Sequence, residues 1–153
     1  MTQLKLIALD EEDLSVVSSH LQDAVMRVSD MAYLPSQQRF AAIVNRFDWE
    51  KAVKTDGEEG YARRRAALHF DRVRGVKLKH LKPGSGTRVL SLLAIGFTAT
   101  EPPSGYVTLT FSGDTSIRLD VECIELELKD LGLSWKARSK PRHPGGEPGS
   151  AGS

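Results

Sequence analysis

The segment NRFDWEK, which begins at Asn45, brings together side chains with which a small active site could be built. It places an amide, a guanidinium, two aromatic rings, two carboxylates and an amine in consecutive positions. On a strand, alternate side chains lie on opposite faces, so Asn45, Phe47 and Trp49 share one face. Arg46 and Asp48 share the other. We expect the aromatics to anchor the core, and Arg46 and Asp48 to pair with each other or across the sheet, which leaves Asn45 and Arg46 as candidate binding residues.

His69 and Asp71 form a second candidate pair, two residues apart on one face of a predicted strand. A carboxylate at this spacing could orient the imidazole as a general base. The single cysteine, Cys123, lies in an alternating apolar run and is expected to be buried as a small hydrophobic residue. No nucleophile motif accompanies the pair.

The motifs of the common catalytic and cofactor sites are missing from the sequence. It has no phosphate-binding loop, dinucleotide-binding glycine motif, zinc-protease motif or serine-hydrolase elbow. We therefore predict no catalytic residues, no metal and no cofactor. An enzyme that uses His69 with Asp71, or Arg46 with Asp48, is the least favoured function.

The densest charge feature is a basic run over residues 63–82. Strand alternation, with a β-bulge at Gly75, places four of its cations on one exposed face. These are Arg72, Arg74, Lys77 and Lys79. We predict a non-catalytic binding or adaptor domain that uses this stripe to contact an acidic protein surface or an anionic ligand.

Two alternatives accompany that prediction. The stripe could bind nucleic acid through phosphate contacts, although its own face lacks aromatic residues on which bases could stack. It could instead pair across the sheet with the acidic side chains of a later strand. Those are Asp120, Glu122, Glu125 and Glu127.

The elements that position these residues are mainly strands. An acidic start and apolar residues at helical spacing predict one helix over residues 10–25. Period-two patterns separated by Gly and Pro turns predict strands in the remainder. The predicted strands cover residues 4–9, 24–35, 39–49, 64–81, 88–100, 106–112 and 115–128. Residues 89–97 are apolar at nearly every position, so we expect a central strand covered on both faces.

Consecutive strands with short turns imply an antiparallel meander. We predict an α+β, mainly antiparallel fold of six to seven strands, a sandwich or partly open barrel with one N-terminal helix. Residues 120–131 fit either a bulged strand or a helix that ends at Gly132. A helix there would make the fold similar to a pleckstrin-homology barrel.

Composition bounds the class of protein. The chain has 153 residues with 21 Lys and Arg against 20 Asp and Glu, so a charged partner must be recognised by a local patch. The lone cysteine, the acidic first residues and the short apolar runs predict a cytoplasmic protein without a membrane partner. We expect a single globular domain over residues 1–135 and a disordered tail rich in Gly, Pro and Ser over 136–153.

Three blocks carry a resemblance to a known family: MAYLPSQQRFAAIVNRFDWE, LHFDRVRGVKLKHL and IRLDVECIELELKDLG followed by Trp135. They resemble an uncharacterised bacterial family of small cytoplasmic proteins classified as a domain of unknown function. The likeness covers nearly all of residues 4–135. It implies no activity, cofactor or catalytic residue, and its members are often encoded near histidinol dehydrogenase.

Overall fold

The computed structural model describes residues 4–47, 63–81 and 86–132. It confirms the predicted α+β class, because these residues form an antiparallel sheet that does not close into a barrel, with one α-helix. In chain order the elements are β1 (Lys5–Ala8), α1 (Glu11–His20), β2 (Val25–Leu34), the 3-10 turn η1 (Pro35–Gln37), β3 (Arg39–Phe47), β4 (Arg63–Phe70), β5 (Val73–Lys79), β6 (Val89–Ala99), β7 (Gly105–Phe111), β8 (Thr115–Val121) and β9 (Leu126–Asp130).

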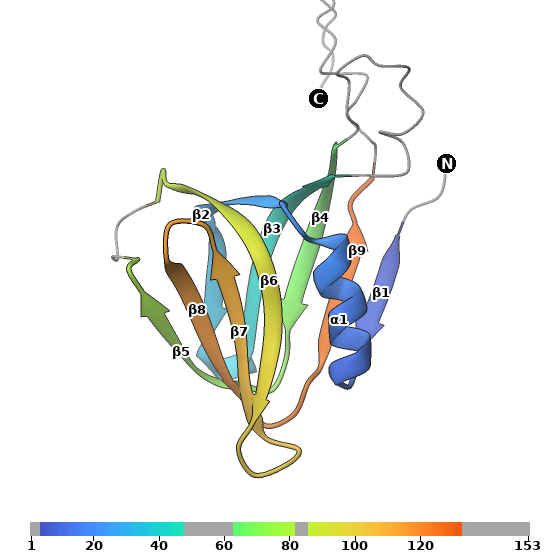
Figure 1. Ribbon diagram of the computed structural model, residues 1–153, viewed down its shortest axis with the longest axis vertical. Helices are drawn as coiled ribbons and strands as arrows, with labels where there is room; N and C mark the ends of the chain where they lie inside the picture. The colour runs from blue at the N-terminus through green and yellow to red at the C-terminus, as the bar shows by residue number, and fades with distance from the viewer. Residues whose placement is uncertain (1–3, 48–62, 82–85, 133–153) are drawn as a thin grey trace, which may run out of the picture.

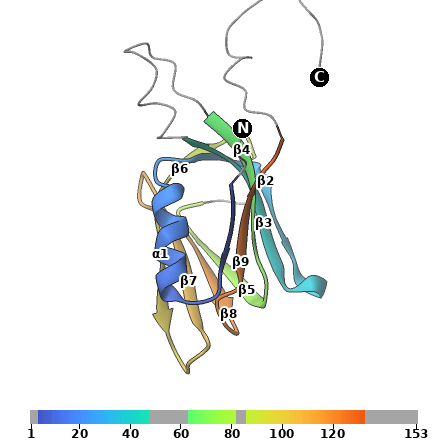
Figure 2. The same ribbon diagram turned by 90° about the vertical axis from the view of Figure 1, so that its right-hand side faces the viewer.

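The strands lie in the order β1-β9-β4-β3-β2-β6-β7-β8-β5. The sheet is strongly curved, so the half from β1 to β2 faces the half from β6 to β5 (Figure 1 and Figure 2). The core lies between the halves and takes alternate side chains from each, including Leu68 and Phe70 on β4 and Leu109 and Phe111 on β7. This curvature sets which side chains of every strand face solvent.

Two long segments pass from one half of the sheet to the other. Residues 63–79 form β4 and β5, residues 115–130 form β8 and β9, and the two segments pair along both halves. We call the place where both segments pass between the halves the corner. There the amide of Asp71 donates to the carbonyl of Glu125 at 2.9 Å, and the amide of Glu122 donates to the carbonyl of Arg72 at 3.0 Å. The predicted six to seven strands become nine because each long strand is interrupted at this corner.

Residues 120–131 form the end of β8, a crossover and β9, so the helical alternative for this segment is wrong. The pleckstrin-homology-like fold required that helix, so this form of the prediction is wrong. The prediction of a sandwich or partly open barrel is confirmed. The interruption covers residues 122–125 rather than one bulged residue, because the chain leaves its neighbours β5 and β7 for β1 and β4. Cys123, predicted to be buried, lies half-exposed in this crossover.

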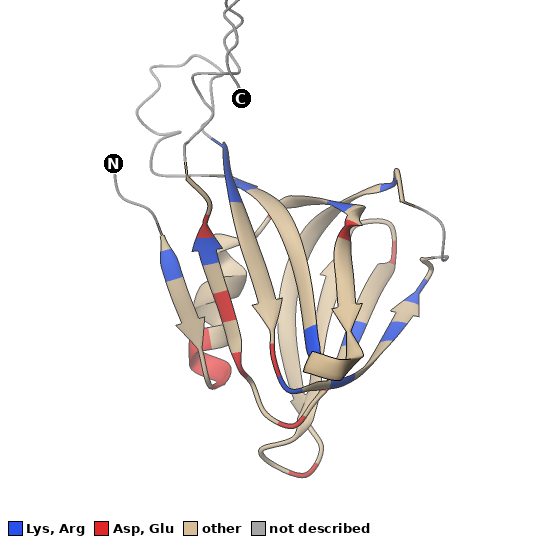
Figure 3. Cartoon of the chain, turned by 180° about the vertical axis from the view of Figure 1, so that it is seen from behind, with Lys and Arg blue, Asp and Glu red and all other residues tan. Residues whose placement is uncertain are grey.

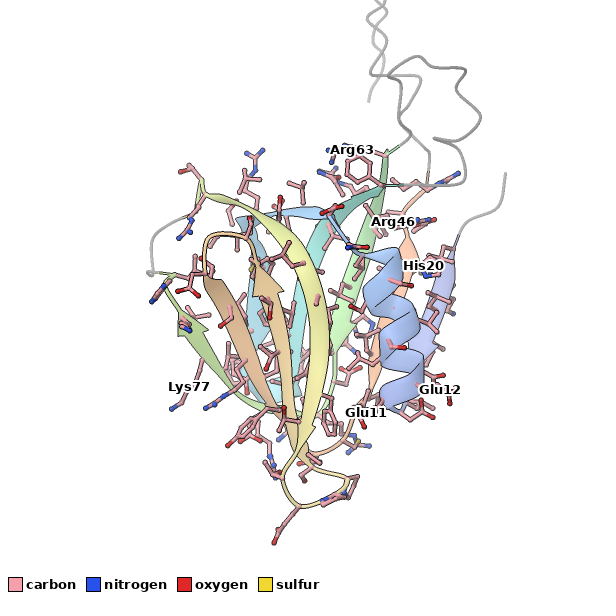
Figure 4. All side chains as sticks on the ribbon, viewed as in Figure 1. Glu11, Glu12, His20, Arg46, Arg63 and Lys77 are labelled. Carbon is pink, nitrogen blue, oxygen red and sulfur yellow. The ribbon has the colours of Figure 1, made fainter. Side chains whose placement is uncertain are left out.

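Helix α1 begins as its acidic first turn predicts. Asp10 is the N-cap, and its Oδ1 accepts a hydrogen bond from the amide of Asp13 at 2.8 Å. Glu11 and Glu12, labelled in Figure 4, follow it in the first turn, where negative charge interacts favourably with the helix dipole. The helix ends at His20, earlier than predicted, since Asp23 has a φ of 67° and the chain then enters β2.

The helix covers the space between β6 and β1 (Figure 1). Leu14 and Val17 point into the core, and Ser18 Oγ accepts a hydrogen bond from the amide of Ile95 on β6 at 3.0 Å. In this way α1 shields an edge of β6 that no strand pairs in the described part of the chain. Within the same residues, no helix has the length and apolarity that crossing a membrane requires.

Strand β6 is central in the sheet, but the prediction that both its faces are covered is wrong. Leu90 and Leu92 are buried, whereas Val89 is 53% and Leu93 46% exposed. The sheet curves around a single core, so the outer face of β6 meets no second layer among the described residues. The outward apolar side chains therefore reflect strand propensity rather than burial.

Gly105, at the start of β7, is the tightest glycine in the sheet. A Cβ at this position would lie 2.5 Å from the backbone oxygen of Thr98 and 2.5 Å from Cζ of Phe97. We expect Gly105→Ala to lower the free energy of unfolding by about 1–3 kcal/mol, since the backbone oxygen cannot withdraw without disturbing the β6–β7 ladder. Urea unfolding measures this loss. Gly96→Ala is the matched control, because its Cβ would meet nothing within 4 Å, and equal losses in both variants would refute the steric argument.

Candidate functional site

The predicted basic stripe lies on and beside β5, an edge strand of the sheet. The register between β5 and β8 shifts between Val73 and Gly75, where the bulge was predicted. The stripe residues Arg72, Arg74, Lys77 and Lys79 are all exposed. Figure 3 shows the basic segments along β5, at the right of that view, and Figure 4 shows Lys77 pointing away from the sheet. The stripe therefore exists as an outward-facing row.

Most of the stripe is already paired with carboxylates, and two of these, Glu125 and Asp120, are among those that the cross-sheet alternative named. The contacts join Arg72 to Glu125 at 3.3 Å, Arg74 to Asp120 at 3.1 Å and Lys79 to Asp114 at 3.9 Å. Arg72 also occupies the corner between the two halves, with a φ of 64°. The hydrogen bond to Glu125 raises the pKa of the Arg72 guanidinium. Much of the predicted positive charge is therefore compensated within the protein.

Lys77 differs from the other stripe residues. It stands directly opposite Arg118 on β8, and within the described residues neither side chain has a carboxylate within 4.0 Å. The guanidinium of Arg118 lies 4.2 Å from the ring centroid of Tyr106 on β7, in a cation–π contact. We call Lys77, Arg118 and Tyr106 the basic face. Strand-by-strand reasoning missed Tyr106 because only the pairing of β7 with β8 brings it beside the stripe.

His69 and Asp71 are neighbours, as their spacing predicted, with His69 Nδ1 3.3 Å from Asp71 Oδ2. The contact is misaligned, so Nδ1 is buried without a hydrogen bond. Asp71 is held instead by Arg39, whose Nε donates to Oδ1 at 2.8 Å, and this bond raises the pKa of Arg39. His69 Nε2 lies 3.7 Å from Glu127 on β9. Arg39, His69, Asp71 and Glu127 therefore form a polar network that links β3, β4 and β9.

Among the described residues, no group of three or more His, Cys, Asp and Glu side chains could hold a metal ion.

Arg46 lies in the core. Asp48, one of the partners expected for it, falls outside the described residues. Its Nε and Nη2 donate to the two carboxylate oxygens of Asp130 on β9, at 3.0 and 2.9 Å. The same carboxylate accepts the amide of Leu4 at 2.8 Å. The guanidinium reaches Asp130 past Ala66, the β4 residue that pairs with both Val44 and Asp130. Arg46 therefore ties β3 to β9 and, through Leu4, to the N-terminal segment.

The face assignment for the segment that begins at Asn45 is wrong. Val44 and Arg46 point into the core, whereas Asn45 and Phe47 are half-buried on the outer face. The reason is that the buried carboxylate of Asp130 compensates the guanidinium, which makes the inward position of an arginine favourable. The guanidinium of Arg63 lies 4.3 Å from the ring centroid of Phe47. Trp49, the other aromatic of this segment, lies outside the described residues.

Asn45 lines a cleft between β2 and β3. The cleft has a volume of about 410 Å³, and its polar walls include Arg27, Ser29 and Asp30 from β2 and Arg65 from β4. The Oδ1 atom of Asn45 is buried and accepts no hydrogen bond. Of the sequence-predicted residues, the structure thus places Asn45 at a cleft, Arg46 in the core and the stripe on the opposite half of the sheet.

Comparison with known families matches residues 4–143 of the chain to DUF2948, described as a protein of unknown function. The chain belongs to the DUF2948 family. The match includes every strand and the helix described above, and it confirms the resemblance to a domain of unknown function. No curated protein and no solved structure matches this DUF2948 chain. Its function must therefore be argued from its own surfaces.

Proposed function

We propose that this DUF2948 protein is a non-catalytic binding domain whose basic face contacts an acidic surface of a partner protein. The observation that carries the proposal is the group of Lys77, Arg118 and Tyr106. Its two cations stand opposite each other on β5 and β8 with no carboxylate within 4.0 Å in the described residues. Like charges directly across a ladder repel each other. An acidic partner would turn that repulsion into attraction, and Tyr106 beside them adds the kind of aromatic contact that is enriched at interfaces.

The proposed surface is narrower than the stripe read from the sequence. Arg72, Arg74 and Lys79 already meet carboxylates, so a partner would have to compete with those contacts. Exposed ion pairs of this kind stabilise a protein only weakly, so Arg74 and Lys79 can still steer a partner at the rim. Among the described residues, Lys77 and Arg118 have no such contact with a carboxylate to break before they bind a partner.

A fluorescent glutamate-rich peptide is the direct probe of this proposal. We expect it to bind the wild-type protein at about 50 mM salt and to weaken as salt rises, because the contacts are between exposed charges. The double variant Lys77→Glu, Arg118→Glu should bind about tenfold or more weakly, since about 1.4 kcal/mol corresponds to a tenfold change in affinity. Fluorescence anisotropy measures both affinities.

Lys5→Glu, Lys129→Glu is the matched control. These two lysines also stand opposite each other across a ladder, between β1 and β9, so the control changes the net charge equally at a different place. Equal weakening by both double variants, or no binding by the wild-type protein, would refute the proposal. A single-stranded oligonucleotide in the same assay tests the alternative, and tighter binding to it than to the peptide would replace the protein partner with nucleic acid.

A cytoplasmic location, a bacterial origin and a gene position near histidinol dehydrogenase stay predictions that accompany this proposal. So does the division into a globular domain over residues 1–135 and a tail over 136–153.

A further inference from the structure

The cleft between β2 and β3 arises from an irregularity in the ladder that joins them. Met26 pairs with Val44 and Met31 pairs with Ala42, so residues 27–30 stand against Ile43 alone. The extra residues turn toward the other side of β2, where the amide of Val28 donates to the carbonyl of Arg88 at 3.0 Å. Strand β2 therefore parts from β3 here. Large bulges of this kind often lie beside functional sites, where they re-aim side chains.

The size of the cleft exceeds what a trapped water needs. One water occupies about 30 Å³ of liquid volume, whereas this cleft measures about 410 Å³ and falls within the range of small-ligand pockets. Its walls are mainly polar, which argues against an apolar ligand. A small polar molecule is the occupant that fits both size and lining.

The charges on the walls are of both signs. Arg27 comes from β2 and Arg65 from β4, on opposite sides of Asn45, while Asp30 lies three residues after Arg27. Guanidinium groups recognise carboxylates well because their donors match the two carboxylate oxygens. A carboxylate alone would leave Asp30 uncompensated, so the lining favours a ligand that carries a positive charge as well.

Asn45 supplies an independent indication of the second group. Its Oδ1 is buried without a donor, an arrangement that costs free energy until a donor arrives. The amide torsion of asparagine is broad, and Asn45 already lines the cleft, so we infer that rotation about this torsion can present Oδ1 to a ligand there. A ligand N–H group would then satisfy it, and an ammonium group would satisfy Asp30 at the same time.

We propose that this cleft binds a small zwitterion of the α-amino acid class. The ligand carboxylate interacts with Arg27, and its ammonium group donates to Asn45 Oδ1 and Asp30. The site is independent of the basic face, because it uses β2, β3 and β4 rather than β5 and β8. It gives the binding domain a second, small-molecule ligand.

The test is a titration of the full-length protein with individual amino acids, followed by NMR chemical shifts of the backbone amides. We expect at least one amino acid to shift the amides of Arg27, Asp30 and Asn45. For that amino acid, the N-acetyl form and the amide form each lack one charge and should bind about tenfold or more weakly. Failure of every amino acid at millimolar concentration, or equal binding of the N-acetyl form, would overturn the proposal.

Variants assign the two ends of the ligand. Arg27→Gln and Asn45→Leu should each weaken both the amino acid and its N-acetyl form, because that form keeps the carboxylate and one N–H donor. Asp30→Asn should weaken the amino acid but not the N-acetyl form, which has no ammonium charge. Arg74→Gln, on the other half of the sheet, is the control and should change neither. The melting temperature of each variant separates loss of binding from loss of fold. Folded cleft variants that bind like the wild type would place the ligand elsewhere and overturn the assignment.

Discussion

Replacing Asp130 with alanine is expected to lower the free energy of unfolding by about 3–5 kcal/mol, as measured by urea denaturation. Asp130 is 2% exposed and accepts two hydrogen bonds from Arg46, which is 7% exposed. Without the carboxylate, the guanidinium stays in the core with its charge uncompensated, and the amide of Leu4 loses its side-chain acceptor. The loss of stability comes mainly from leaving the buried charge of Arg46 without a counter-ion.

The double variant Arg46→Met, Asp130→Leu is the control for that interpretation. Apolar side chains of similar size often replace a buried ion pair at little cost, so the double variant should be more stable than Asp130→Ala. A double variant as unstable as the single one would show that the shape of the pair, rather than its charge, stabilises the fold.

Replacing Phe70 with alanine is also expected to lower the free energy of unfolding by about 3–5 kcal/mol. Phe70 is 1% exposed at the end of β4, immediately before the corner, and its ring centroid lies 6.4 Å from that of Phe40 on β3. Removing the ring leaves a cavity where the two halves of the sheet meet, which the paired long strands cannot close. Urea unfolding again provides the measurement.

Leu93→Ala is the matched control for Phe70→Ala. Leu93 is 46% exposed on β6, so its truncation should change the stability by no more than about 0.5 kcal/mol. A loss at Leu93 comparable with that at Phe70 would mean that the outer face of β6 is covered in solution. Phe70→Leu should retain more stability than Phe70→Ala, because it leaves a smaller cavity.

Local patterns predicted the elements well where one physical signal dominated. Asp10 followed by acids predicted the helix start, and the period-two alternation of residues 106–112 predicted β7. The opposite charges of the stripe and of Asp120 and Glu125 predicted that these strands are neighbours, which they are. Each of these inferences depends on residues close in sequence or on a clear charge pattern.

The faces of β3 and β6 could not be read in the same way. Period two fixes which residues share a face but not which face is inward. An inward Arg46 is favourable only beside Asp130, which lies 84 residues away in the chain. The apolar run of β6 implied burial on both faces, but whether a second layer covers a strand is a property of the whole sheet.

For the candidate sites too, some features depend on neighbouring residues and others on the pairing of distant strands. Neighbouring side chains are enough to specify the class of the fold, the helix, the turns and an outward basic row, so these could be predicted. The pairing of distant strands sets three further features: most of that row is compensated, Tyr106 and Arg118 join Lys77, and β2 parts from β3 beside Asn45. Charge compensation and clefts depend on distances between strands, and those distances are set only when the sheet curves around its core.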